Sequence, residues 1–271
     1  MRIAAVQMNS SDDPGSNLEL AAELIGSARR RDAALVVLPE NFSVMPASEQ
    51  QRRTFAEPEG DGRVQAFLSS QAREHGIWII GGTAPIRSDD GERIKAACLV
   101  YDDDGRQAAR YDKIHLFDVE VRDGESYRES DAFEPGGTGP DNLVCVETPA
   151  GPVGLSVCYD VRFPELYRRL VEAGARILTV PAAFTATTGE AHWEPLLRAR
   201  AIENQCYVVA PGQWGEHASG RRTHGNTMII DPWGRIAARQ ESGDGVVVAD
   251  IDLDELAQIR ERMPVLGHRR L

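Results

Sequence analysis

Short apolar runs and longer amphipathic stretches take turns along most of this chain of 271 residues. The apolar runs have the length and the residue types of β-strands. Six of them are expected to be strands: Ile3–Met8, Ala34–Leu38, Ile77–Gly81, Val153–Cys158, Ile177–Val180 and Tyr207–Ala210. Four stretches have helical periodicity: Asn17–Arg30, Val64–His75, Phe163–Ala173 and Glu190–Asn204. Strands that alternate with helices predict a layered α/β protein.

Two expected β-hairpins interrupt this alternation. One joins Arg93–Tyr101 to Gln107–Lys113, and the other joins Thr227–Asp231 to Arg235–Arg239. Both have alternating flanks and turn-forming residues at the tip. Because a hairpin places its two strands antiparallel, we expect mixed sheets rather than purely parallel ones.

A single domain accounts for the whole chain, because no segment has the composition of an interdomain linker. The Gly/Pro-rich segments 135–142 and 211–225 are expected to be surface loops. The last segment, 253–271, begins as a helix and ends in Pro264–Arg270, which has little helical pattern. We expect this tail to pack on a partner subunit.

The charge balance disfavours two classes of partner. Lysine and arginine total 30 residues, aspartate and glutamate total 42, and the formal net charge is −12. Nucleic acids and anionic membranes both bind a basic face, so neither is expected as a partner. The N-terminal apolar run turns polar too early for a signal peptide, and no run approaches the roughly 18 apolar residues of a membrane span.

The cysteines bear on the redox setting. They stand at positions 98, 145, 158 and 206, far apart and without a C-x-x-C pair. This spacing disfavours both a zinc site and a disulfide framework, so we expect a reducing, cytoplasmic setting. Phosphate-loop and metal-ligand motifs are also missing from the sequence, and we expect no metal and no organic cofactor.

Cys158 stands where a predicted buried strand, Gly154–Val157, gives way to a predicted helix that opens at Arg162–Leu166. Backbone N–H groups at the start of a helix stabilise a thiolate and a developing oxyanion. The alternative is a buried structural cysteine, which is the commoner role of a lone cysteine and the one we assign to the other three.

Glu40 directly follows the apolar run Ala34–Leu38. Ligand-binding residues gather at the carboxyl ends of strands in α/β sheets. A carboxylate that is partly screened from water there would have a raised pKa and could act as a general base. The alternative is an exposed turn glutamate, the more common fate of this residue type.

Lysine is rare in this chain, which uses arginine for 28 of its 30 basic residues and keeps lysine only at Lys95 and Lys113. Lysine differs from arginine as a compact point charge whose pKa can fall on burial. The retention of lysine at position 113 therefore favours a role that a guanidinium group cannot fill. Lys95 shows, however, that a lysine is also retained at a position with no such role. The alternative for Lys113 is an exposed lysine on an edge strand.

A thiol, a carboxylate and an ammonium together form a set that can hydrolyse an amide. The segments Leu38–Asn41, Tyr111–Asp118 and Val157–Leu166, which carry them in the order Glu, Lys, Cys, resemble the carbon–nitrogen hydrolase (nitrilase) superfamily. Three further segments share the resemblance: Ala191–Glu194, Arg198–Asn204 and Asp231–Gly234. The resemblance extends from the first strand to the C-terminal tail.

This resemblance implies a four-layer α-β-β-α sandwich that forms one carbon–nitrogen hydrolase domain over residues 1–271 and assembles as a homodimer or larger homo-oligomer. It also implies that Cys158 is the nucleophile, Glu40 the general base and Lys113 the oxyanion stabiliser, beside the Tyr159 backbone N–H. A second glutamate of the family falls at Glu129 in the segment Tyr127-Arg128-Glu129-Ser130. The nearby Glu120 and Glu125 are alternatives for that role.

Within the superfamily, the segments Cys158–Leu166 and Leu197–Ala210 most resemble the deaminated-glutathione amidase branch. The implied reaction releases 2-oxoglutarate and cysteinylglycine. The ω-amidase branch, which acts on 2-oxoglutaramate or 2-oxosuccinamate, shares Arg162 and the stretch Thr187–Trp193, and another small aliphatic amidase is a further alternative. Segment 211–225 departs from the family pattern, which leaves the leaving group open.

Several residues are expected to bind the substrate. Both branches act on γ-linked amides of 2-oxo acids, so we expect Arg162 to bind a substrate carboxylate, with a structural salt bridge as the alternative. Tyr159, Thr188 and His192 are further candidates. The pocket should be locally basic, with Lys113 and Arg162 facing an anionic substrate.

Three other classes of protein can be weighed against an amidase. A papain-like hydrolase needs a histidine directed at Cys158, and neither His115 nor His192 stands in a matching motif. An acyltransferase would pass the same thioester to an amine instead of water. A non-catalytic interaction protein would have lost one of the three reactive residues, and all three are present.

Overall fold

Two β-sheets packed face to face form the centre of the molecule. The computed structural model describes residues 1–88, 91–121 and 125–270. The first sheet has the strand order β17-β1-β2-β3-β5-β4, with β6 paired to β5, and the second has the order β16-β15-β12-β11-β10-β9. The bounds in the first sheet are β1 (Arg2–Gln7), β2 (Leu35–Val37), β3 (Trp78–Ile80), β4 (Ala84–Arg87), β5 (Ile94–Tyr101), β6 (Gln107–Asp112) and β17 (Gly245–Asp250). Those in the second are β9 (Cys145–Thr148), β10 (Gly151–Leu155), β11 (Ile177–Thr179), β12 (Tyr207–Ala210), β15 (Thr227–Ile230) and β16 (Ile236–Gln240).

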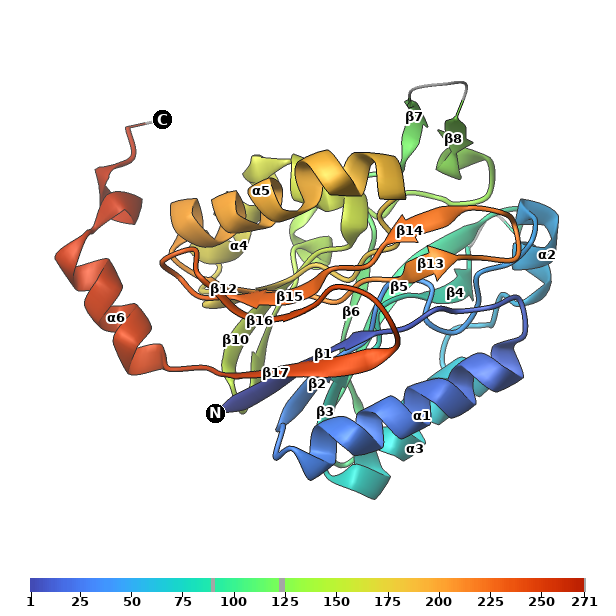
Figure 1. Cartoon of the computed structure of the whole chain (residues 1–271), viewed down its shortest axis with the longest axis horizontal. Helices are drawn as coiled ribbons and strands as arrows, with labels where there is room; N and C mark the ends of the chain where they lie inside the picture. Colours follow the sequence, from blue (N-terminus) through green and yellow to red (C-terminus); the bar gives the residue numbers. More distant parts are fainter. Residues whose placement is uncertain (89–90, 122–124, 271) are drawn as a thin grey trace.

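Helices cover the outer face of each sheet. The first sheet carries α1 (Pro14–Arg30) and α3 (Arg63–His75), and the second carries α4 (Pro164–Glu172) and α5 (Ala186–Asn204), as Figure 1 shows. The predicted α-β-β-α sandwich and its mixed sheets are thereby confirmed. Of the helices in the described residues, none is both long and apolar enough to cross a membrane.

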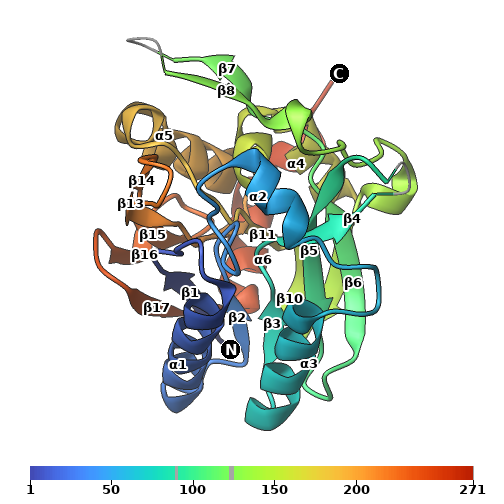
Figure 2. The ribbon, with the colours of Figure 1, turned by 90° about the vertical axis from the view of Figure 1, so that its right-hand side faces the viewer.

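The smaller elements lie at the periphery. They are α2 (Glu49–Thr54), α6 (Leu253–Arg262), the ribbon β7 (Asp118–Glu120) with β8 (Ser126–Arg128), the ribbon β13 (Trp214–Glu216) with β14 (Arg222–His224), and the 3₁₀ turns η2 (Glu129–Asp131), η3 (Pro140–Asn142), η4 (Cys158–Arg162) and η5 (Val265–His268). Figure 2 shows the β7–β8 ribbon projecting from the body of the molecule. In Figure 1, α6 reaches away from the sandwich.

Strand β1 shows why the apolar runs are continuous rather than alternating. Ile3 and Ala5 face the core between the two sheets, whereas Ala4 and Val6 pack in the core beneath α1 and α3. Successive side chains of a strand point to opposite faces, so a strand buried on both faces must be apolar throughout.

Local signals fix the helix ends. The Asp13 side chain accepts hydrogen bonds from the N–H groups of Gly15 and Ser16 at the start of α1, and Pro14 occupies the first turn. Helix α3 ends at Gly76, whose φ of 56° places it in the left-handed region that glycine enters freely.

The structure differs from the sequence prediction at several elements, among them α2 and the ribbon β7–β8, which were not predicted. Segment 211–225, expected as a loop, contains the ribbon β13–β14. Strand β10 ends at Leu155, so Cys158 lies in the turn η4 and not in a strand. The edge strands β4, β9 and β17 were not predicted. β4 and β9 are four-residue runs with a weak strand pattern, whereas the valine-rich run of β17 was overlooked. Leu271, at the end of the predicted tail, lies outside the described residues.

Candidate active site

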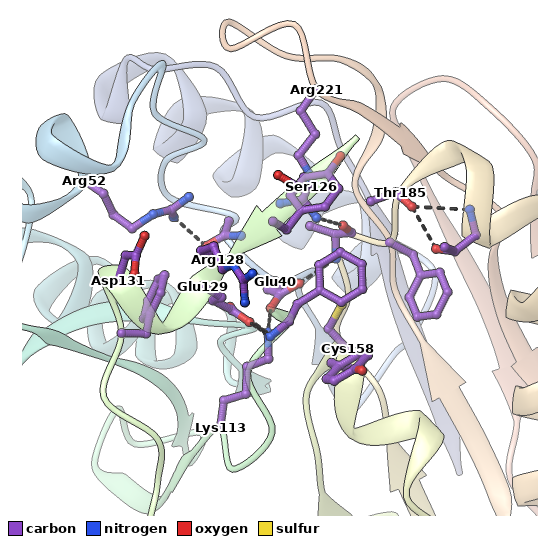
Figure 3. Close-up of a pocket in the computed structure, with 18 residues that line it drawn as sticks. Glu40, Arg52, Lys113, Ser126, Arg128, Glu129, Asp131, Cys158, Thr185 and Arg221 are labelled. Carbon is purple, nitrogen blue, oxygen red and sulfur yellow. Dashed lines mark hydrogen bonds and ion pairs between the residues drawn. The ribbon is translucent and has the colours of Figure 1, made fainter. Parts of the chain in front are cut away.

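Glu40, Lys113 and Cys158, which are 45 or more positions apart in sequence, line one cavity of about 320 Å³. Glu40 follows β2, Lys113 follows β6 and Cys158 opens η4 beyond β10. Figure 3 shows their side chains directed toward one another. The cavity therefore lies across the edges of the two sheets, where the carboxyl ends of parallel strands meet.

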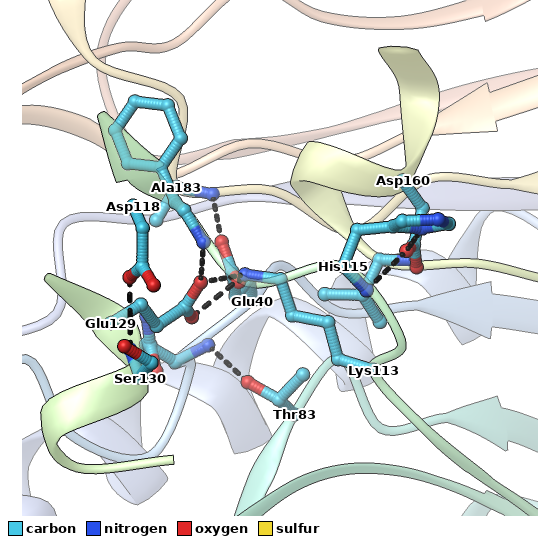
Figure 4. Close-up of polar contacts among 12 residues, drawn as sticks. Glu40, Thr83, Lys113, His115, Asp118, Glu129, Ser130, Asp160 and Ala183 are labelled. Atoms are coloured by element: carbon cyan, nitrogen blue, oxygen red, sulfur yellow. Dashed lines mark hydrogen bonds and ion pairs between the residues drawn. The ribbon is translucent and has the colours of Figure 1, made fainter. Parts of the chain in front are cut away.

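Lys113 is enclosed by two carboxylates. Its Nζ lies 2.8 Å from Glu40 Oε1 and 2.7 and 2.8 Å from the two oxygens of Glu129 (Figure 4). The residue is only 2% exposed, which excludes the edge-strand alternative. Burial acts to lower the pKa of Lys113, but the charges of Glu129 and Glu40 outweigh it and raise the pKa. Lys113 is therefore an ammonium ion, as the role of oxyanion stabiliser requires.

Glu40 is 3% exposed and fully hydrogen-bonded, so it is not the exposed turn residue of the alternative interpretation. Besides Lys113, its carboxylate accepts a hydrogen bond from the Ala183 N–H at 2.8 Å and shares one with the Cys158 thiol. Burial acts to raise the pKa of Glu40, but the Lys113 ammonium outweighs it and lowers the pKa. The expectation of a raised pKa was wrong, because it considered burial without the partner charge.

The neighbouring loop holds Glu40 in place. Gly82 follows β3 with φ of 53°, and a Cβ atom there would lie 1.9 Å from the Pro39 carbonyl oxygen. Glycine therefore lets this loop pack directly on the strand end that carries Glu40. The next residue, Asn41, donates its N–H to Thr83 Oγ1 at 2.8 Å.

Cys158 occupies a strained backbone position. Its φ of 49° is in the left-handed region, which costs a non-glycine residue about 1–2 kcal/mol. Its own N–H donates to the Pro181 carbonyl at 2.8 Å, so that group is not available to a substrate. The Tyr159 N–H, at the start of η4, has no acceptor within that turn. Burial first, and then the Glu40 charge, raise the pKa of the Cys158 thiol, which is therefore protonated at neutral pH.

A buried carboxylate that the sequence interpretation passed over fixes this turn. Asp160 is fully buried and accepts hydrogen bonds from the Val157 N–H at 2.8 Å, the His115 N–H at 3.1 Å and the Tyr111 hydroxyl at 2.6 Å. His115 Nδ1 lies 2.7 Å from its Oδ1 (Figure 4). Asp160 thus ties η4 to the segment that carries Lys113. The position of Asp160, two residues after Cys158, was the signal in the sequence that could have identified it as part of the site.

Among the three candidate glutamates, only Glu129 contacts Lys113 in the described residues. Its Oε2 also accepts the Phe117 N–H at 2.6 Å, which sets its orientation. Glu120 is exposed and lies 3.9 Å from Arg128. Glu125 accepts hydrogen bonds from Tyr127 and Thr187 instead.

Arg162 does not line the cavity with Cys158, contrary to expectation. It lies in an adjoining hollow together with Tyr159, Thr188 and His192. Its Nη1 is 3.2 Å from His192 Nδ1, and its guanidinium lies over the rings of Tyr159 and Phe184. The alternative, a structural salt bridge, is not formed with any of the described residues either. Tyr159 and Thr188 line both spaces.

Three arginines that sequence reasoning missed line the cavity instead: Arg52, Arg128 and Arg221. They come from α2, β8 and the segment before β14. The cavity is locally basic as expected. Its positive charge comes from these three arginines and Lys113, however, and not from Arg162. In a chain that uses arginine almost everywhere, residue type alone gives no signal for them.

The described residues contain no cluster of three or more His, Cys, Asp or Glu side chains arranged to hold a metal ion. The chemistry that the cavity can supply is that of its own side chains: a thiol beside an ionised carboxylate, and a fixed ammonium ion.

Comparison with known proteins gives consistent results. The carbon-nitrogen hydrolase family matches residues 2–261. A deaminated glutathione amidase from Synechocystis sp. is 46% identical over 268 residues, covering 98% of this chain and 97% of the relative. The crystal structure of Saccharomyces cerevisiae Nit3, a member of branch 10 of the nitrilase superfamily, has a TM-score of 0.88 at 31% identity and covers 100% of this chain and 97% of its own.

A third similar structure bears on the cysteine. It is an amidase from Nesterenkonia sp. in which acrylamide has added to the active-site cysteine. It is 26% identical to this chain with a TM-score of 0.80, and the match covers 97% of this chain and 98% of that one.

Proposed function

This chain belongs to the carbon–nitrogen hydrolase family, and from that premise we propose that it hydrolyses the γ-linked amide of deaminated glutathione to 2-oxoglutarate and cysteinylglycine. The observation that carries the proposal is the contact of Lys113 with both Glu40 and Glu129 beside the Cys158 thiol in one cavity. Relatives that are 42–46% identical over nearly the whole chain and named deaminated glutathione amidase support the substrate.

The first half of the reaction forms a thioester. Glu40, ionised at neutral pH, takes the proton of the Cys158 thiol as the sulfur attacks the amide carbonyl carbon. The oxyanion that develops is stabilised by the Lys113 ammonium and the Tyr159 N–H. Glu40 then gives its proton to the amide nitrogen, the C–N bond breaks, and the amine leaves.

The second half returns the enzyme to its starting state. Glu40 takes a proton from water, the resulting hydroxide attacks the thioester carbonyl, and the same two donors stabilise the second oxyanion. When the C–S bond breaks, the proton on Glu40 returns to sulfur. Glu129 holds the Lys113 ammonium in position throughout and is a positioning residue in this scheme.

Cys158→Ala should abolish turnover, since no nucleophile remains, and Glu40→Gln should do the same because an amide cannot accept the thiol proton. Both variants should keep the thermal stability of the parent to within a few degrees. The measurement is release of 2-oxoglutarate from deaminated glutathione. Appreciable turnover by Cys158→Ala would remove the cysteine from its proposed role.

A side-by-side assay separates the two branches. Deaminated glutathione and 2-oxoglutaramate share the acyl group and differ in the leaving amine, which is cysteinylglycine in one and ammonia in the other. We expect the higher kcat/KM with deaminated glutathione. A preference for 2-oxoglutaramate would assign the chain as an ω-amidase. Turnover only with an added amine acceptor would indicate acyl transfer.

We also propose that the chain works in a reducing, cytoplasmic compartment and as a homodimer or larger homo-oligomer. The four unpaired cysteines support the compartment. Support for assembly comes from α6, where only Leu256 is buried, and from the exposed apolar side chains of Met263 and Val265 that follow it. Light scattering of the full chain tests the assembly, and a monomer at micromolar concentration would contradict it.

A further inference from the structure

The cavity with Cys158 continues outward into a second, wider space. This outer space has a volume of about 760 Å³ and shares Arg52, Ser126, Tyr127 and Arg221 with the inner cavity. A substrate that reaches Cys158 can therefore extend into the outer space, past the two arginines. Figure 3 shows Arg52 and Arg221 among the side chains that line the same pocket as Glu40 and Cys158.

Arg221 lies near enough to Glu40 for its charge to help lower the pKa of that carboxylate, and one of its N–H donors has no partner in the described residues. It makes one hydrogen bond, from Nη2 to the Ala183 carbonyl at 2.5 Å, and its guanidinium lies 5.0 Å from the centre of the Tyr127 ring. Its Nε is buried without a hydrogen-bond partner, and it forms no ion pair with a carboxylate of the described residues. Leaving a buried N–H without a partner is unfavourable, so this geometry favours an incoming acceptor.

The position of Arg221 indicates which part of the substrate it faces. Ala183 joins Arg221 to Glu40, because its carbonyl accepts from Arg221 while its N–H donates to Glu40 Oε2. Glu40 is the group that protonates the leaving nitrogen in the proposed mechanism, so the leaving amine lies on this side of the thioester. Arg162, in contrast, lies in the other hollow with His192.

We propose that Arg221 binds a carboxylate on the leaving amine, so that the preferred substrates are amides whose amine part is itself an acid, such as a short peptide. Arg52, which donates to Asn41 Oδ1 at 3.0 Å, adds positive charge at the same junction. Guanidinium suits this role because it offers a planar fork of N–H donors that matches a carboxylate. The inference rests on the proposed function and identifies the residue that selects the leaving group.

The test uses three substrates with one acyl group. They are deaminated glutathione, the same compound with its terminal carboxylate converted to a carboxamide, and 2-oxoglutaramate, which releases only ammonia. For the unmodified enzyme we expect kcat/KM to fall about 10- to 100-fold when the carboxylate becomes a carboxamide, the loss expected for one charge-assisted contact. Arg221→Met should reduce that ratio to near 1. Because the ratio compares two substrates on the same variant, a general change in turnover caused by the substitution cancels from it.

The control variant is Arg235→Met, an exposed arginine at a hairpin tip remote from the cavity, which should keep the full ratio. Equal rates of the unmodified enzyme on the acid and the carboxamide would overturn the inference without any variant, as would an Arg221→Met variant that keeps the preference. In either case hydrolysis itself persists, and the proposed function stands. If the unmodified enzyme hydrolysed none of the three substrates, the proposed function itself would be contradicted.

Discussion

The two lysines of this chain are held in different ways. Lys113 is enclosed by Glu40 and Glu129, and the trio carries a net charge of −1 within a buried cavity. Lys95 pairs with Glu134 at 2.8 Å and contacts the Pro135 carbonyl at the rim of the first sheet. An ammonium ion at Lys113 satisfies both carboxylates from one point, which a planar guanidinium of larger volume cannot do in the same space.

Lys113→Arg should therefore lower kcat about 100- to 1,000-fold, the usual effect of removing one oxyanion donor, although the charge is kept. Lys95→Arg is the matched control, because it makes the same substitution outside the cavity and should keep kcat within about two-fold. Steady-state kinetics on deaminated glutathione measure both. A Lys113→Arg enzyme with near-normal kcat would show that any cation serves at this position.

At the scale of single residues, the sequence predicted which groups meet but not how they ionise. Residue types at strand ends identified Glu40, Lys113 and Cys158, and the structure brings all three together. The sign of the pKa shift of Glu40 was wrong, because it depends on a contact of 2.8 Å with Lys113, more than 70 positions away in sequence. Arg221 lies in a segment with no family pattern and could not be identified from residue type.

At the scale of elements, the turn η4 depends on one carboxylate. Asp160 accepts hydrogen bonds from donors on η4 and on the segment after β6, and these contacts hold Cys158 at its unfavourable φ. The predicted order of strand and helix was right, but the strand ends at Leu155 rather than next to Cys158. The prediction could not reveal the 3₁₀ turn, whose geometry depends on those distant donors.

Asp160→Asn is expected to lower the free energy of unfolding by about 2–4 kcal/mol, because its new NH₂ group would face hydrogen-bond donors inside a buried site. Since the turn relaxes, kcat should fall at least about ten-fold as well. Urea unfolding measures the first effect through the transition midpoint at constant slope. An unchanged midpoint would mean that the turn is held by other contacts.

The ribbon β13–β14 is coupled to pH through His217. Its Nδ1 lies 2.9 Å from the Ser10 carbonyl oxygen and its Nε2 lies 2.7 Å from Thr223 Oγ1, an arrangement that suits neutral imidazole. Burial lowers the pKa of His217, and burial with the Arg239 charge lowers that of His224. The unfolded chain therefore takes up these protons first as the pH falls below about 6.5.

The two neutral histidines should therefore contribute their full stabilisation above pH 6.5. As the pH falls from there toward their lower folded-state pKa values, the free energy of unfolding should decrease. His217→Gln should show a smaller decrease between pH 7 and pH 5.5 than the parent. Urea titrations at the two pH values measure it, with exposed His268→Gln as the control. Equal decreases in parent and His217→Gln would exclude this histidine as a source of the pH dependence.

At the scale of the whole molecule, the catalytic group is assembled from both sheets. Glu40 and Lys113 follow strands of the first sheet, whereas Cys158 and Ala183 follow strands of the second. The alternation of strands and helices correctly predicted a layered α/β protein, because burial on both faces leaves a clear apolar signature, and the resemblance to the family implied the four layers. The strand order, with β4 and β17 at the two ends of the first sheet, follows from long-range pairing that no local pattern encodes.

The pairing of β1 with β17 has a consequence for biosynthesis. Arg2 pairs with Asp250 and Gln7 with Gly245, so β1, the first strand to be synthesised, pairs with β17, the last strand to be synthesised. While the ribosome is still adding residues, β1 has only β2 beside it and its other edge is open. The nascent chain therefore carries an unpaired inner strand until residue 250 has emerged, and a chaperone that covers open strand edges would act during this interval.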